Sequence, residues 1–260
     1  MQTLTVILTL LAGIFAGILT GLMGSSGVMV IVPAMTLLGY RVHEAVAISL
    51  AVDMVASVVV TVTYFRHDQV NLRQGLWVAL AAVGGAQIGS RLSVYIPEFG
   101  LGSGYGVLLF ISAVPFWRRG TRREKPEIRE DAAYIQWLKQ HPLFTSIFLG
   151  LSIGAAAGVF GVGGGILFLF ALLIIGYDLH KAIGTSTLIM ALATASGAAG
   201  HALIGNLPYS AAALATVGTI GGGFAAAWVA NHLSERRLGK LIAVVFVFLG
   251  IAMFVAPLLR

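Results

Sequence analysis

The chain is a series of long apolar runs joined by short polar connections. The runs cover residues 3–22, 28–40, 45–65, 75–95 and 99–117, and then 143–161, 166–177, 182–203, 210–232 and 240–257. A membrane-spanning helix needs about 20 consecutive apolar residues, and most of these runs have that length. The runs are continuous, whereas the strands of a membrane barrel alternate polar and apolar residues. The pattern therefore predicts an all-α polytopic membrane protein.

Composition and charge agree with this class. Of the 260 residues, 58% are hydrophobic and 10% are charged, against about 25% charged in soluble domains. A net charge of +6 would suggest nucleic-acid binding in a soluble protein, but in a membrane protein basic residues mainly set the orientation of the chain in the bilayer. We therefore expect a lipid bilayer, and no nucleic acid, as partner. The chain has no cysteine, which excludes disulfides and thiolate metal sites. We expect no cofactor and no metal.

The two halves of the chain are similar to each other. Positions 17–91 align with 154–228 without a gap, and the pattern Gly-Tyr-x-x-His-x-Ala-x-x-x-Ser begins at Gly39 and again at Gly176. Each half holds five apolar runs, and an odd number gives the two halves opposite topology. We predict a first transmembrane repeat over 1–117, a basic cytoplasmic loop over 118–142 and an inverted second repeat over 143–260.

The distribution of basic residues supports this orientation. With 118–142 in the cytoplasm, the cytoplasmic loops hold thirteen of the sixteen Lys and Arg residues. Positive residues concentrate on the cytoplasmic side of membranes. We therefore expect a multi-pass membrane protein with both termini on the side opposite the cytoplasm. A homodimer is an open alternative.

Two short apolar runs, 28–40 and 166–177, each follow a glycine cluster, so we expect broken or re-entrant helices there. A helix that restarts after a break offers free N–H groups and a positive dipole end to an anion. Tight helix crossing is the other use of glycine in membranes. We expect tight crossing at Gly17, Gly21, Gly154 and Gly158. The candidate substrate-binding residues are Gly24, Ser25, Ser26, Gly27, Gly161, Gly163, Gly164 and Gly165, with hydroxyl groups from Ser49, Thr185 and Ser186.

Asp53 lies in the middle of the run 45–65. A carboxylate inside a membrane helix costs about 2.5–3.5 kcal/mol on insertion scales. Proton coupling or gating is one interpretation of Asp53, and a structural hydrogen bond to a Ser or Thr of a neighbouring helix is the other. The histidines His43, His180 and His201 are candidates for the same coupling or gating role. Helix capping or polar packing is the alternative for each of them.

These features resemble the TauE/SafE family of sulfite exporters and related anion permeases. The resemblance rests on Gly-x-x-x-Gly-x-x-Gly in each half, followed by a glycine-rich break, a short apolar segment and Gly-Tyr-x-x-His-x-Ala. The first half departs in having Ser25-Ser26 where the second half has Val162-Gly163. The resemblance implies transport of sulfite or an organosulfonate across the bacterial inner membrane.

We therefore expect a secondary transporter, and not an enzyme, that exports a small sulfur oxyanion such as sulfite or sulfoacetate. The anion would be held between the glycine breaks of the two repeats and moved by alternating access, with proton coupling left open. A passive anion channel and a permease for a different small anion are the alternatives. The sequence contains no His-Glu-x-x-His or Walker pattern, which disfavours zinc hydrolysis and direct ATP drive.

Overall fold

The computed structural model describes residues 2–23, 27–66, 68, 70–121, 136, 138, 140–175, 177, 179–230 and 235–255. Within these ranges the chain is helical and contains no strand, which confirms the all-α class. The helices are α1 (Gln2–Met23), η1 (Gly27–Val30), α2 (Ile31–Leu37), α3 (Val42–Phe65), α4 (Leu72–Ser93), α5 (Glu98–Thr121), α7 (Pro142–Phe160), α8 (Gly165–Ile175), α9 (Leu179–Leu203), α10 (Tyr209–Ala230) and α11 (Glu235–Val255). Each predicted apolar run coincides with one of these helices, except the run 28–40, which coincides with η1 and α2 together.

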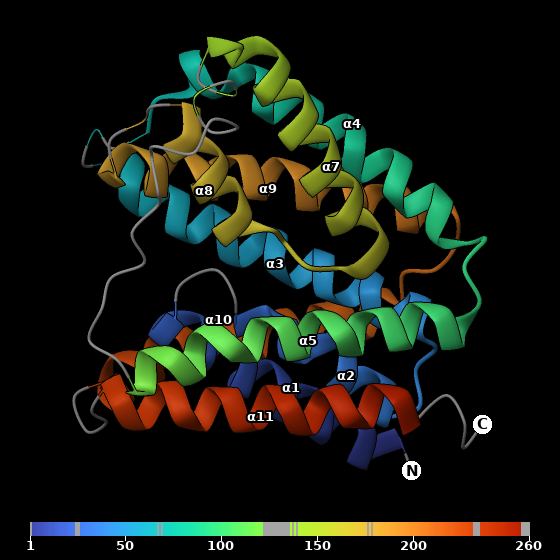
Figure 1. Cartoon of the computed structure of the whole chain (residues 1–260). Helices are drawn as coiled ribbons and strands as arrows, with labels where there is room; N and C mark the ends of the chain where they lie inside the picture. Colours follow the sequence, from blue (N-terminus) through green and yellow to red (C-terminus); the bar gives the residue numbers. More distant parts are fainter. Residues whose placement is uncertain are drawn as a thin grey trace. The chain divides into compact units, whose positions relative to one another are not determined.

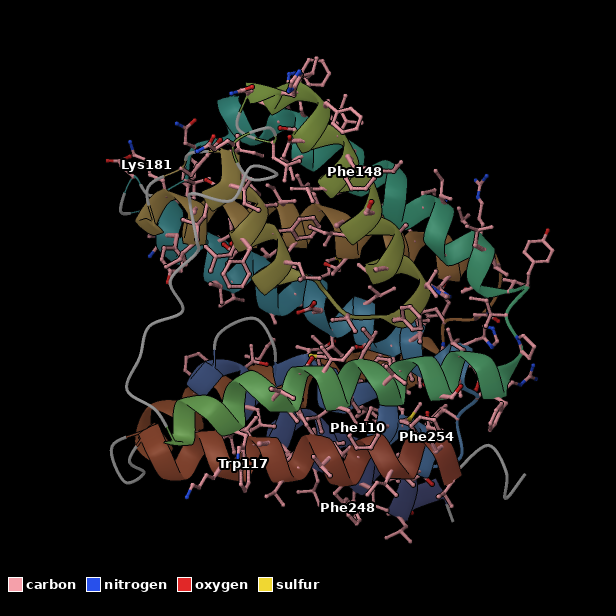
Figure 2. The ribbon with its side chains drawn as sticks, in the orientation of Figure 1. Phe110, Trp117, Phe148, Lys181, Phe248 and Phe254 are labelled. Atoms are coloured by element: carbon pink, nitrogen blue, oxygen red, sulfur yellow. The ribbon has the colours of Figure 1, made fainter. Side chains whose placement is uncertain are left out.

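Four of the described helices are long and apolar enough to cross a membrane. The segments are Thr3–Thr20, Val42–Val62, Pro142–Phe160 and Lys181–Leu203. Large apolar side chains also lie on the outside of the helices. Phe148 and Phe248, for example, are 54% and 67% exposed (Figure 2). Apolar surface on this scale is expected where lipid takes the place of water, so the chain is a multi-pass membrane protein.

The two apolar segments that follow the glycine clusters are half-helices. The elements η1 and α2 together cover residues 27–37, and α8 covers Gly165–Ile175. The 11 residues of α8 span about 16 Å at 1.5 Å per residue. This is about half of the ~30 Å hydrocarbon core of a bilayer. Neither segment is long enough to cross a membrane, as the glycine clusters predicted.

The repeated Gly-Tyr motif marks the ends of these half-helices. Gly39 has φ 100°, a conformation that residues with a side chain rarely adopt. The N–H of Tyr40 donates to the carbonyl of Met35 at 3.1 Å, which is the outer bond of a Schellman C-cap. The N–H of Tyr177 donates in the same way to the carbonyl of Leu172 at 3.0 Å. The motif therefore acts as a helix stop signal after α2, and the same outer bond is present after α8.

The described helices form two compact units, and each unit contains helices from both halves of the sequence. The first unit combines α1, η1, α2 and the start of α3, through Ser49, with α5, α10 and α11. The second unit combines the rest of α3, from Leu50, with α4, α7, α8 and α9. In the first unit α1 packs along α10 and α5 along α11, and in the second α4 packs along α7 (Figure 1). Neither half of the sequence therefore forms a compact unit by itself.

Glycines allow the paired helices to approach closely. In the first unit a Cβ at Gly17 would overlap the backbone carbonyl of Thr219 on α10. In the second unit Gly154, which aligns with Gly17 in the internal repeat, meets the carbonyl of Ala82 on α4 in the same way. Ala82 aligns in turn with Thr219. Similar close contacts occur at Gly13, Gly85, Gly150, Gly158, Gly218 and Gly222. The expected role in tight crossing is thus confirmed for Gly17, Gly154 and Gly158.

The core of the first unit ties its half-helix to α5. Tyr105 is fully buried, and its hydroxyl donates to the carbonyl of Met29 at 2.7 Å. Farther along the same helix, Phe110 stacks on Phe254 of α11, with ring centroids 6.2 Å apart and an interplanar angle of 26° (Figure 2). Because Met29 lies in η1, the Tyr105 hydrogen bond fixes the start of the first half-helix against α5.

Candidate functional site

The second glycine cluster separates α7 from α8 inside the second unit. Gly161 caps α7 in the left-handed conformation, with φ 70° and ψ 20°, and its N–H donates to the carbonyl of Ala157 at 2.8 Å. Gly164 is also left-handed, with φ 69°. Its carbonyl accepts the first hydrogen bond of α8, from the N–H of Phe168 at 2.8 Å. Glycine is required at these two positions because side chains destabilise left-handed backbone.

The start of α8 presents backbone N–H groups without partners in the helix. The N–H groups of residues 165–167 precede the first hydrogen bond of α8 and have no acceptor within it. The helix dipole adds a partial positive charge at the same end. Gly161, Gly163, Gly164 and Gly165 are all buried, so this helix end lies in the interior of the unit. Such an end can hold a negative charge.

Asp53 contacts this break from α3. The residue is 1% exposed, and neither carboxyl oxygen has a hydrogen-bond partner among the residues that the structure describes. A Cβ at Gly163 would overlap Oδ2 of Asp53 and lie 2.8 Å from its Cγ. The carboxyl group therefore rests directly on the backbone of Gly163. The hydroxyl of Ser57 donates to the main-chain carbonyl of Asp53 at 2.5 Å and leaves the carboxyl oxygens unbonded.

Apolar side chains also lie close to the break. The Sδ atom of Met190 would lie 3.0 Å from a Cβ at Gly163, and Cγ2 of Ile153 would lie 2.8 Å from a Cβ at Gly164. Met190 aligns with Asp53 in the internal repeat, so these two residues occupy matching positions in the two halves of the sequence. Sequence reasoning did not assign Met190 to the site, although this alignment was a signal that could have done so.

His201 holds the end of α7 next to the break. Its side chain is fully buried, and Nε2 lies 2.9 Å from the carbonyl oxygen of Gly158. A carbonyl only accepts hydrogen bonds, so Nε2 is the donor. Gly158 is in the last turn of α7, whose carbonyls lack partners within the helix. His201 therefore caps α7, and this contact supports polar packing as the interpretation of His201.

The hydroxyl groups predicted to bind substrate make other contacts. Oγ1 of Thr185 accepts a hydrogen bond from the N–H of Asn71 at 2.9 Å. The hydroxyl of Ser186 donates to the carbonyl of Ile183 at 2.9 Å, within α9. Ser49 is buried on the part of α3 that belongs to the first unit. These hydrogen bonds of Thr185 and Ser186 do not involve the break, and the role of all three residues in substrate binding stays a prediction.

Tyr177 joins the loop before α4 to the start of α9. Its hydroxyl donates to the carbonyl of Asn71 at 2.9 Å, next to the bond between Asn71 and Thr185. Burial raises the pKa of Tyr177 to about 12, so the phenol keeps its proton and remains a donor at neutral pH. Sequence reasoning missed this connection, because an asparagine in a polar loop carries no signal of a specific partner.

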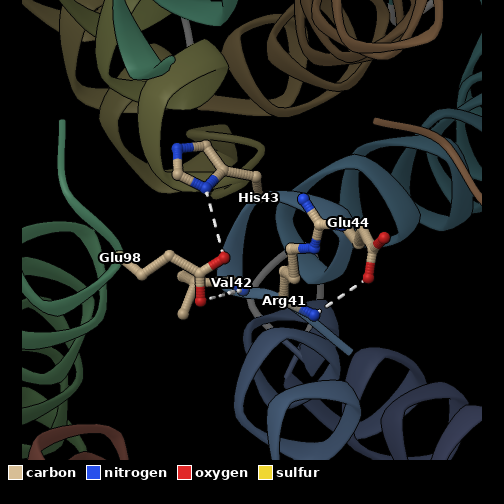
Figure 3. Close-up of polar contacts among 5 residues, drawn as sticks. All are labelled: Arg41, Val42, His43, Glu44 and Glu98. Carbon is tan, nitrogen blue, oxygen red and sulfur yellow. Dashed lines mark hydrogen bonds and ion pairs between the residues drawn. The ribbon is translucent and has the colours of Figure 1, made fainter. Parts of the chain in front are cut away.

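His43 belongs to the first unit and lies in a group of contacts at the start of α3 (Figure 3). Its Nδ1 is 3.8 Å from Oε1 of Glu98, and Oε2 of Glu98 accepts from the N–H of Val42 at 3.5 Å. Oε2 of Glu44 accepts from the N–H of Arg41 at 2.9 Å, which is the backward bond of a capping box. The capping bonds come from Glu44 and Glu98, and His43 contacts one of these two capping residues, so its own role stays a prediction.

Some predicted positions lie outside the described residues. They are Gly24, Ser25 and Ser26 of the first cluster, and the side chain of His180. Gly27 is the first residue of η1. The roles assigned to these residues stay predictions. In the part of the chain that the structure describes, no three His, Cys, Asp or Glu side chains come together to hold a metal ion.

Comparison with known proteins decides the family. The family model described as sulfite exporter TauE/SafE matches residues 9–253. The chain belongs to the TauE/SafE family. Probable membrane transporter protein YdhB of Bacillus subtilis (strain 168) is 25% identical over 240 residues, covering 90% of this chain and 94% of YdhB. Probable membrane transporter protein YunE of the same strain is 22% identical over 260 residues, covering 94% of this chain and 95% of YunE.

A relative from Sinorhizobium is also described as a probable membrane transporter. Probable membrane transporter protein y4hK of Sinorhizobium fredii (strain NBRC 101917 / NGR234) is 24% identical over 234 residues, covering 88% of this chain and 90% of y4hK. No solved structure gives a significant match. As a member of the TauE/SafE family, the chain is a membrane transporter and not an enzyme. The resemblance found in the sequence is thereby confirmed.

Proposed function

We propose that this TauE/SafE transporter exports a small sulfur oxyanion, sulfite or an organosulfonate such as sulfoacetate, across the bacterial inner membrane. The observation that carries the proposal is the buried start of α8, where the N–H groups of residues 165–167 have no acceptor in the helix. An oxyanion accepts several hydrogen bonds from such a helix end and is stabilised by its dipole. The family's description as sulfite exporters supports sulfur as the central atom.

The substrate is held mainly by the backbone in this proposal. The helices that meet at the break, α7 and α8, carry no Lys or Arg. Glycines at 161 and 163–165 place no side chain of their own between the main chain and its surroundings, so an anion that enters the site can approach the N–H groups closely. Recognition by backbone N–H groups favours a compact anion with several oxygens. The expectation that the break of the first repeat shares the same anion stays a prediction.

We further propose that the two halves are inverted repeats whose movement gives alternating access. Equal spacing supports this: α3 and α9 begin at 42 and 179, and α5 and α11 begin at 98 and 235, with the same offset in both pairs. The matched contacts of Gly17 and Gly154 with opposing carbonyls add packing evidence. The excess of basic residues in the loops assigned to the cytoplasm supports periplasmic termini. The negative-inside potential by itself favours export of an anion, by about 2.3 kcal/mol per charge per 100 mV.

A flux assay in proteoliposomes tests the proposal. The purified chain is reconstituted, and efflux of sulfite, sulfoacetate, sulfate and chloride is measured at several concentrations with an imposed membrane potential. We expect saturable efflux of sulfite or sulfoacetate and little flux of chloride. Flux without saturation would favour the alternative of a passive channel. Saturable flux of a different anion would favour the alternative substrate, and no flux of either sulfur anion would overturn the proposal.

A pair of variants connects the flux to the break. Gly164→Val adds a side chain to a left-handed residue that faces Ile153 and Phe168, so it is expected to abolish flux. Gly84→Val is the matched control, because a Cβ at Gly84 meets nothing within 4 Å. Normal flux in the Gly164→Val variant would argue against the break as the binding site. The panel of anions with the wild-type chain decides the proposal even where Gly164→Val fails to fold.

A further inference from the structure

The carboxyl group of Asp53 is the feature of the break that an anion site alone leaves unexplained. It lies in the interior of the second unit, with Oδ2 against the backbone of Gly163. Neither of its oxygens has a hydrogen-bond partner in the described ranges. When the carboxyl group of Asp53 is charged, it repels any anion that approaches the N–H groups of residues 165–167, which follow closely after Gly163 in the chain. The site therefore combines one group that attracts an anion with one that rejects it.

The helices of the second unit offer no described counter-charge to Asp53. Helices α7 and α8 contain no ionisable residue. On α9, His201 is in the last turn and is bonded to the carbonyl of Gly158. The remaining basic residues of α9 and α4 lie in the first or last turns of those helices: His180, Lys181, Arg73 and Arg91. Asp53 itself is in the middle of α3. A proton is therefore the simplest counter-charge for Asp53.

We propose that the anion binds at the break only when Asp53 carries a proton, so that one proton crosses the membrane with each anion. A proton from the solution adds to the carboxylate, and the resulting O–H donates a hydrogen bond to an oxygen of the anion. No other bond is made or broken, and both the anion and the proton leave on the far side. The inference rests on the proposed function, since it adds the coupling ion to the same site. A divalent anion such as sulfite or sulfoacetate keeps one net negative charge when one proton accompanies it, so the membrane potential still favours its export.

The geometry fits a proton better than a metal cation. A hard cation such as Na⁺ takes several oxygen ligands. Among the described residues, no three His, Cys, Asp or Glu side chains come together to hold a metal ion, and the thioether of Met190 lies beside the same glycine as the carboxyl group of Asp53. A protonated carboxyl group needs one acceptor for its hydrogen, and the bound anion supplies it.

Proton counting in proteoliposomes tests the inference. The full chain is reconstituted with a pH-sensitive dye inside, sulfoacetate is the probe, and a potassium clamp holds the potential at zero. We expect saturable sulfoacetate flux with one proton moving per anion in the same direction. At alkaline pH the apparent affinity for sulfoacetate should fall tenfold per pH unit, because a single proton is linked to binding.

Two variants sharpen the test. Asp53→Asn keeps the shape and an N–H donor but takes up no proton, so we expect saturable flux that moves no protons and is independent of pH. Glu44→Gln is the matched control, because it neutralises an acid at the exposed start of the same helix. This control should retain the proton count of the wild-type chain.

The outcomes separate the inference from the proposed function. Saturable wild-type flux without proton movement, or flux that requires Na⁺ at constant pH, would overturn the inference and leave the proposed transport intact. An unchanged proton count in Asp53→Asn would overturn it as well. Absence of saturable sulfoacetate flux would overturn the organosulfonate substrate and this inference together. The wild-type proton count is decisive even where Asp53→Asn fails to fold.

Discussion

Replacing Gly163 by alanine measures whether Asp53 rests on the break as described. The added Cβ would overlap Oδ2 of Asp53 and lie 3.0 Å from Sδ of Met190. The end of the Met190 side chain can move away, but Asp53 is held in the middle of α3 and fully surrounded. Forcing a methyl group into a filled interior typically costs about 1–3 kcal/mol. We expect Gly163→Ala to lower the free energy of unfolding by this amount.

The assay is thermal unfolding of the purified chain in one detergent. A loss of 1 kcal/mol corresponds to about 2–4 °C in Tm for a domain of 150–250 residues. Asp53→Ala removes the carboxyl group and makes room, so the same Gly163→Ala change should cost less in that background. The difference between the two backgrounds should fall within the ~0.5–3 kcal/mol found for residues in contact.

The control for Gly163→Ala is a glycine on α4 that has free space around it. Gly84→Ala adds a methyl group where nothing lies within 4 Å, and we expect it to leave Tm unchanged or slightly raised. Equal costs of Gly163→Ala in the two backgrounds would show that Asp53 and Gly163 do not touch. A Gly163→Ala variant as stable as Gly84→Ala would refute the description of the break as closely packed.

Three further predictions concern packing and capping. His201→Phe removes the donor to the end of α7 and should cost about 1–3 kcal/mol of stability, whereas His201→Gln, which retains an N–H donor, should cost less; equal losses in Tm would contradict the capping role. Gly154→Leu should keep α7 from lying along α4, so the variant should aggregate in gel filtration, and a monodisperse variant with wild-type Tm would refute the close crossing. Glu98→Gln weakens an ion pair at a partly exposed site and should cost at most about 1 kcal/mol; a larger fall in Tm would show that Glu98 holds the start of α3 in a way that this pair does not explain.

Helix positions and breaks could be predicted from the sequence because the membrane imposes a simple pattern. Long apolar runs leave little alternative to helices, and the boundaries of α3 and α9 follow the predicted runs closely. The short runs after the glycine clusters form half-helices because they are too short to span a membrane. The Gly-Tyr motif was recognised as a repeat, and the structure explains it as a helix stop at Gly39.

The partners of each helix could not be predicted, because the helices are apolar on all sides and the pattern marks no single buried face. Glycines four residues apart, such as Gly17 and Gly21, indicated a crossing, but nothing in the sequence named α10 as the partner of α1. The contact of Asp53 with Gly163 joins positions in opposite halves of the sequence. Likewise, the bond of His201 to the end of α7 depends on how α9 packs against it, which residue types alone do not determine.

The most direct test of the central claim is to locate a bound oxyanion. Selenite replaces sulfite with a strong anomalous scatterer, and the chain has no cysteine with which selenite would react. We predict a selenium peak at the start of α8, with selenite oxygens about 2.7–3.2 Å from the nitrogens of residues 165–167. A peak elsewhere, with none at the break, in a protein that transports sulfite would contradict the account.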